Sequence, residues 1–100
     1  MPATFLDRID LEAIAGQVGT PFYLYDAGTL RQRIADVRAI APGDGIQTRY
    51  AMKACSLRRV LEEMHAAGVW IDAVSGNEVL RALAAGFPAG HQPPVVLLTA

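Results

Sequence analysis

The alternation of short apolar stretches with amphipathic segments constrains the fold of this chain more than any other feature of its sequence. A helical stretch in residues 1–20 comes first. It is followed across residues 21–100 by the order strand, helix, strand, helix, strand, helix, strand. Parallel strands joined through helices use right-handed crossovers. The sequence therefore predicts an α/β fold with a parallel sheet.

Turn and capping signals delimit the individual elements. Asp26 is a favourable N-cap for one helix, and Gly68 and Gly86 suit the left-handed residue that commonly follows a helix. The last strand is apolar on both faces and therefore needs cover on both sides. Strands are predicted over residues 22–25, 46–53, 69–74 and 95–99, and helices over residues 27–40, after Ser56 and after Ser75.

The length of the chain limits how this pattern can be completed. A full (β/α)8 barrel needs about 250 residues, whereas this sequence has 100. We interpret residues 1–100 as the first βα units of a (β/α)8 (TIM) barrel, truncated after a strand. The alternative is a compact four-stranded α/β domain that is complete in itself.

Composition excludes several classes of protein. The chain is 52% hydrophobic and 19% charged with a net charge of −1, which is typical of a folded protein and gives no argument for binding nucleic acid or an anionic membrane. Its apolar runs are shorter than the roughly 20 residues that span a bilayer, and its first ten residues lack a signal-peptide core. With one cysteine, Cys55, a cytoplasmic location is expected.

Lys53 is the main candidate for chemistry, because it comes at the end of a predicted strand, where barrels carry their active sites. The residues around it are small or apolar, and its parity places it on the same face as Ala51, which leaves room. A lysine amine held in apolar surroundings gives up its proton more readily, as a Schiff-base lysine requires. The competing interpretation is a solvated lysine at the end of a strand.

Two sequence blocks share a distinctive order and separation. The first is YAMKA at residues 50–54, and the second is GVWIDAVSGNE at residues 68–78. They resemble the Y-A-x-K-A and G-x-x-x-D-x-x-S-x-x-E blocks of the fold-type III pyridoxal-phosphate decarboxylases. TPFYLYD at residues 20–26 is similar to the first strand of that family. The most similar subgroup is the diaminopimelate decarboxylases.

The resemblance implies a cofactor and roles for individual residues. In this family the lysine of the first block holds pyridoxal 5'-phosphate as a Schiff base, so Lys53 is expected to do so here. Asp72 matches the acidic residue of the second block and is expected to bind near the cofactor as a charge partner of the lysine. Ala51, Ser75 and Glu78 are expected to form a supporting shell. The phosphate-binding residues and the partner of the ring nitrogen would lie downstream of residue 100.

Several of these residues have structural interpretations as well. The S-x-x-E spacing of Ser75 and Glu78 is a capping box, which we favour over direct catalysis. Asp72 has a weaker alternative, because aspartate is disfavoured inside strands. Cys55 stands where many relatives carry asparagine, and we interpret it as a packing residue. The two histidines, His65 and His91, have no second ligand at metal spacing, so no metal site is predicted.

The predicted activity is a carboxy-lyase reaction that converts meso-2,6-diaminopimelate to L-lysine, in a homodimer with a second, C-terminal β domain. The 100 residues alone are expected to be inactive. Ornithine, arginine or carboxynorspermidine decarboxylase remains open, since the substrate-binding residues would lie downstream; alanine racemase shares the lysine but fits the second block less well. Two other classes remain open: a non-catalytic pyridoxal-phosphate-binding protein, and a plain α/β interaction module in which Lys53 is unreactive.

Overall fold

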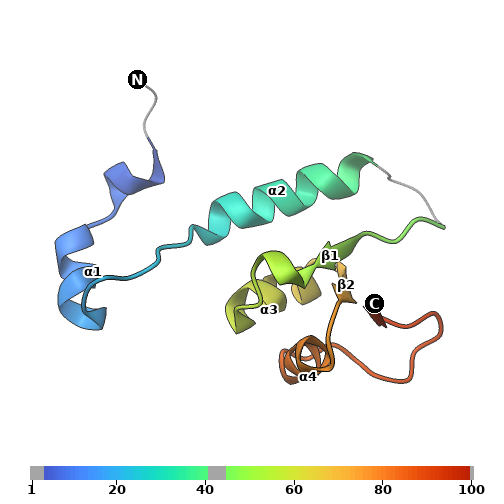
Figure 1. Cartoon of the computed structure of the whole chain (residues 1–100). Helices are drawn as coiled ribbons and strands as arrows, with labels where there is room; N and C mark the ends of the chain where they lie inside the picture. The colour runs from blue at the N-terminus through green and yellow to red at the C-terminus, as the bar shows by residue number, and fades with distance from the viewer. Residues whose placement is uncertain (1–3, 41–44, 100) are drawn as a thin grey trace. The chain divides into compact units, whose positions relative to one another are not determined.

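The computed structural model describes residues 4–40 and 45–99 (Figure 1). The chain divides into two compact units, Met1–Leu30 and Arg31–Ala100. The regular elements in chain order are two 3-10 helices, four α-helices and three strands. They are η1 (Phe5–Arg8), α1 (Leu11–Val18), α2 (Ala27–Ile40), β1 (Arg49–Ala51), η2 (Met52–Ala54), α3 (Arg58–Ala66), β2 (Trp70–Ala73), α4 (Gly76–Ala84) and β3 (Val96–Leu98).

The predicted helix over residues 1–20 is divided into η1 and α1. Asp10 starts the second of these, because its carboxylate accepts a hydrogen bond from the Ala13 amide at 3.0 Å and so caps α1. The helix ends at Gly19, whose φ of 82° lies in the left-handed region that glycine adopts without strain. Residues 1–3 of this prediction lie outside the described residues.

The predicted strand over residues 22–25 is wrong, since this stretch is not part of any sheet. A strand is stabilised when a neighbouring strand pairs with its backbone groups. The described part of the unit Met1–Leu30 holds no other strand. Tyr23 is 91% exposed as a result, and Tyr25 is also exposed.

Helix α2 begins at the predicted residue because Asp26 caps it. The Asp26 carboxylate accepts hydrogen bonds from the hydroxyl of Thr29 and from its amide, the latter at 3.2 Å. The hydroxyl bond in particular holds the pKa of the Asp26 carboxyl below its usual value. The buried stripe predicted for α2 is only partly observed: Ile34 is buried, Val37 is exposed, and Ala41 lies outside the described residues.

The unit Arg31–Ala100 contains the predicted parallel sheet, in the order β1-β2-β3. In its register Ala51 lies beside Asp72, and Asp72 lies beside Leu97. The predicted strand over residues 46–53 is shorter than expected, because β1 ends at Ala51 and η2 follows at once. Lys53 therefore lies in a turn after the strand and is not its last residue.

The two faces of the sheet differ in cover. On one face α4 packs against β2 and β3, and α3 packs against α4, so that Ile71 and Ala73 of β2 are completely buried, as is Leu61 of α3. By alternation and register the other face carries Arg49 and Ala51 of β1, Trp70 and Asp72 of β2, and Leu97 of β3. We call these five residues the open face.

Strand β3 is the least covered of the three. Leu97 on the open face is 36% exposed and Leu98 on the helix side is 55% exposed. The sequence predicts apolar surface on both faces of this strand, and the structure confirms it. Within the described residues no helix is long and apolar enough to cross a bilayer.

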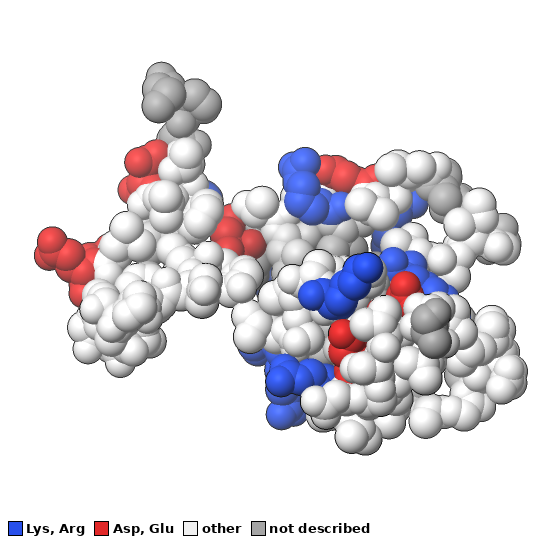
Figure 2. All heavy atoms as spheres, viewed as in Figure 1, with Lys and Arg blue, Asp and Glu red and all other residues white. Residues whose placement is uncertain are grey.

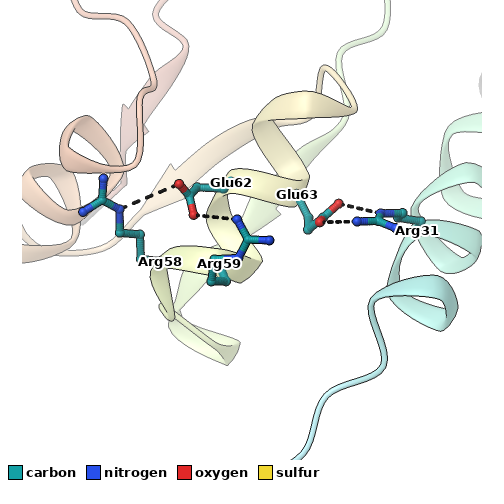
Figure 3. A network of polar contacts seen from close by, with 5 residues as sticks. All are labelled: Arg31, Arg58, Arg59, Glu62 and Glu63. Atoms are coloured by element: carbon teal, nitrogen blue, oxygen red, sulfur yellow. Dashed lines mark hydrogen bonds and ion pairs between the residues drawn. The ribbon is translucent and has the colours of Figure 1, made fainter.

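Ion pairs link the helices of this unit (Figure 3). Arg31 of α2 donates two hydrogen bonds to Glu63 of α3, at 2.9 Å from Nε and 2.7 Å from Nη2. These bonds lower the pKa of the Glu63 carboxyl and raise that of the Arg31 guanidinium. Glu62 makes looser pairs with Arg58 at 3.8 Å and Arg59 at 3.4 Å. Figure 2 accordingly shows blue basic side chains of this unit next to red acidic ones.

Replacing Glu63 with glutamine is expected to lower the unfolding temperature slightly at neutral pH. Because the pKa of this carboxyl is depressed in the folded state, its stabilising contribution is present above the unfolded pKa of about 4.3 and is lost as pH falls through the folded value. The difference from wild type should therefore vanish in strong acid. Thermal unfolding from pH 7 to pH 2 measures it, with Glu62→Gln as the control for a looser pair. A deficit that persists unchanged in acid would indicate lost packing.

Candidate active site

The amine of Lys53 lies at the carboxyl end of the sheet. Its residue sits in η2, directly after β1, and is exposed. Its neighbour Met52 is fully buried and anchors the turn to the core. In the part of the chain that the structure describes, no hydrogen bond or ion pair engages the Lys53 side chain. The amine is thus presented on a fixed turn without being committed to a structural contact.

The turn that carries Lys53 is closed by a hydrogen bond. The Tyr50 hydroxyl donates to the Cys55 carbonyl at 2.8 Å, so the bond spans the residues on both sides of the lysine. Tyr50 lies on the opposite face of β1 from Ala51 by alternation. Cys55 is half-buried, and its interpretation as a packing residue stays a prediction.

Replacing Tyr50 with phenylalanine is expected to loosen this turn while leaving the fold intact. The variant loses one hydrogen bond to a backbone carbonyl, which costs about 0.5–1.5 kcal/mol of folding stability. Urea unfolding measures that loss, and amide hydrogen exchange over residues 52–55 measures the loosening. Tyr23→Phe is the matched control, since Tyr23 is 91% exposed. Unchanged exchange in the Tyr50 variant would contradict this account of the turn.

Asp72 lies on the open face beside the residue from which the Lys53 turn departs. It is level with Ala51 in the register, and Ala51 precedes Lys53 by two positions. Asp72 is half-buried, and its Oδ1 accepts a hydrogen bond from the Thr99 hydroxyl at 2.6 Å. The described residues contain no ion pair between Asp72 and Lys53, so a charge partnership of the two stays a prediction.

Thr99 is the residue of this site that sequence reasoning missed. Its backbone amide donates to the Ala73 carbonyl at 2.8 Å, which continues the pairing of β3 with β2 past Leu98. The available signal was parity, because Leu97 and Thr99 are two positions apart and therefore share a face of the strand.

Ser75 and Glu78 hold the turn between β2 and α4. The Ser75 hydroxyl accepts a hydrogen bond from the Glu78 amide at 3.1 Å, as the predicted capping box requires. The return contact differs from the prediction, because the Glu78 carboxylate accepts from the Val74 amide at 3.0 Å rather than from that of Ser75. Val74 directly follows the end of β2, where its amide would otherwise lack an intrastrand partner.

Arg49 ties the three strands together at the opposite end of the open face. Its guanidinium donates hydrogen bonds to the carbonyls of Ile71 at 3.1 Å, Val95 at 3.0 Å and Pro94 at 2.6 Å. The same group lies 5.2 Å from the centre of the Trp70 ring, within cation–π distance. This arginine therefore fixes the alignment of β1 on β2 and of β2 on β3.

Both histidines make ring contacts. His91 lies edge-on to Trp70 with ring centres 5.3 Å apart, and His65 lies 4.8 Å from Phe87. These contacts suit packing roles for the two rings. Among the described residues no three potential metal ligands come together.

The groups at the carboxyl end of the sheet suit a cofactor that bears an aldehyde. Lys53 offers an uncommitted primary amine, the small Ala51 leaves space beside it, and Asp72 supplies a carboxylate oriented by a hydroxyl. An amine with a nearby carboxylate is the combination that forms and stabilises a protonated Schiff base. The fold and this arrangement define a class of α/β proteins that present a Schiff-base lysine at the carboxyl end of a parallel sheet.

Comparison with known families agrees with this class. The family model described as the pyridoxal-binding domain of pyridoxal-dependent decarboxylases matches residues 27–93. The chain belongs to this family, which confirms the resemblance carried by the two sequence blocks.

Individual relatives narrow the comparison further. The diaminopimelate decarboxylase of Streptomyces coelicolor is 45% identical over 95 residues, which is 95% of this chain and 20% of that protein. Those of Bacillus subtilis and Escherichia coli K12 are each 37% identical, over 81% and 97% of this chain and over 19% and 22% of the relatives. The chain thus spans about a fifth of the length of the curated relatives that it matches.

Proposed function

We propose that these residues belong to a pyridoxal-phosphate-dependent decarboxylase that converts meso-2,6-diaminopimelate to L-lysine and carbon dioxide. The observation that carries the proposal is the uncommitted Lys53 amine at the carboxyl end of the sheet, with Asp72 beside the strand that delivers it. The choice of substrate is supported by relatives that are named diaminopimelate decarboxylases.

Each residue of the site has a role in this proposal. Lys53 binds the cofactor covalently and is released to move protons when the substrate amine takes its place. Asp72 faces the positive charge at that nitrogen, Ala51 leaves room for the ring, and Ser75 and Glu78 hold the turn after β2. When bound, pyridoxal phosphate supplies a sink for the electrons that remain when the substrate carboxylate leaves as carbon dioxide.

The proposal extends to the whole protein. Residues 1–100 form the opening of a pyridoxal-phosphate-binding barrel, whose remaining strands and C-terminal β domain other residues supply. The uncovered Leu97 and Leu98 of β3 support this, because they need apolar partners from elsewhere. The complete enzyme is a cytoplasmic homodimer, and its single cysteine in this stretch is compatible with a reducing compartment.

The test uses the full-length protein with pyridoxal phosphate. An absorbance band of the lysine-bound cofactor is expected, and borohydride reduction followed by peptide mapping should place the label on Lys53. Carbon dioxide release is then compared for diaminopimelate, ornithine and arginine. Absence of the band would overturn the cofactor proposal and favour an α/β module with an unreactive lysine. Binding without release from any substrate would favour a non-catalytic cofactor-binding protein.

A further inference from the structure

The hydrogen bond between Thr99 and Asp72 has the geometry of a built contact. Thr99 Oγ1 lies 2.6 Å from Asp72 Oδ1, a length typical of a hydroxyl that donates to a charged carboxylate. The Thr99 backbone is fixed at the same time by its amide bond to the Ala73 carbonyl at 2.8 Å. Sheet pairing therefore delivers the hydroxyl to the carboxylate.

This contact occupies one of the two carboxylate oxygens and leaves the other available. Among the described residues, Asp72 Oδ2 accepts no hydrogen bond and pairs with no cation. A carboxylate held by one oxygen loses rotational freedom about its terminal torsion, so the direction of the second oxygen is set as well. The hydroxyl thus orients the carboxylate toward whatever lies beside it on the open face.

The groups that face Asp72 identify the cation it can meet. From β3 its register neighbour is the apolar Leu97. On β1 and the turn that follows, the cationic residues are Arg49 and Lys53, and Arg49 is bound to three backbone carbonyls at the other end of the open face. In this described segment, Lys53 is the cation without a fixed partner.

We propose that Thr99 is a positioning residue of the Lys53 site, whose hydroxyl directs the free oxygen of Asp72 toward the lysine nitrogen. The inference rests on the proposed function, because it concerns the same lysine and the same cofactor. It adds a residue from a third strand that neither sequence block contains. The site then draws on β1 for the nucleophile, β2 for the carboxylate and the end of β3 for the group that aims it.

The test measures the pH midpoint of the cofactor absorbance band in the full-length protein loaded with pyridoxal phosphate. Thr99→Val removes the hydroxyl at constant shape. It should lower the midpoint by about half a pH unit or more, because the carboxylate no longer faces the protonated nitrogen. Thr99→Ser keeps a hydroxyl and should restore the wild-type midpoint. In an Asp72→Asn background, Thr99→Val should change nothing further.

Each result decides between named outcomes. A wild-type midpoint in Thr99→Val, or a serine variant that behaves like valine, overturns the positioning role while the proposed function stands. A wild-type protein without the cofactor band overturns both. Should Thr99→Val fail to fold, Thr99→Ala replaces it, since the readout requires only loss of the hydroxyl. Borohydride labelling of Lys53 in each variant confirms that the band reports on the same nitrogen.

Discussion

Replacing Lys53 with alanine is expected to abolish covalent capture of pyridoxal phosphate. Lys53 is the only lysine in this sequence, so within these residues no other side chain can form a Schiff base with the cofactor. Turnover should also fall by at least about 10²-fold, the usual contribution of a positioned proton-transfer group. Borohydride reduction, peptide mass mapping and carbon dioxide release measure the two effects on the full-length protein.

Two further variants separate nucleophilicity from charge. Lys53→Arg keeps the positive charge but offers no amine that condenses with an aldehyde, so it should fail like alanine. Arg58→Ala is the matched control, because this exposed arginine of α3 makes only a 3.8 Å contact with Glu62. Covalent label retained elsewhere at the site in Lys53→Ala would show that the nucleophile has been misassigned.

Replacing Arg49 with methionine is expected to cause the largest loss of stability among the open-face substitutions. The variant keeps a long apolar side chain but leaves three carbonyls without their donor, at Ile71, Pro94 and Val95. Hydrogen bonds from a charged donor are each worth about 1.5–3 kcal/mol, and solvent will replace part of this. We expect a net loss of about 2–4 kcal/mol on that scale, measured by chemical denaturation of the full-length protein.

The matched variants test whether geometry or charge is responsible. Arg49→Lys retains the charge, but an ammonium cannot reproduce the fork that reaches three carbonyls, so it should recover only part of the loss. Arg33→Met removes an exposed arginine that is paired with Asp36 at 3.0 Å, and it should change stability little. Equal losses in the Arg49 and Arg33 variants would contradict the clamp.

Sequence patterns predicted the sheet and its helices well where a buried face imposed a period. In β2, Val69, Ile71 and Ala73 follow the alternation of a strand covered on one side, and all three are buried. In α2 the boundaries were predictable because Asp26 supplies a cap. These signals are local, so they can be read without knowing what packs against them.

The predictions that failed depended on partners remote in sequence. Residues 22–25 have strand-like composition, but composition cannot supply the neighbouring strand that their backbone requires. The position of Lys53 was predicted to within a turn, yet η2 ends the strand two residues early because Tyr50 reaches over to Cys55. The contact of Asp72 with Thr99 joins residues 27 apart, and only the register of the sheet brings them together.

Strand β2 divides its residues between two kinds of constraint. Ile71 and Ala73 are fully buried against the helices, whereas Asp72 between them faces the open side and touches no part of that core. A mutational scan should therefore show a period of two: substitutions at 71 and 73 should reduce the amount of folded protein in cells, while Asp72→Asn should leave abundance intact and change only chemistry. The chemistry of this strand can thus evolve independently of its folding.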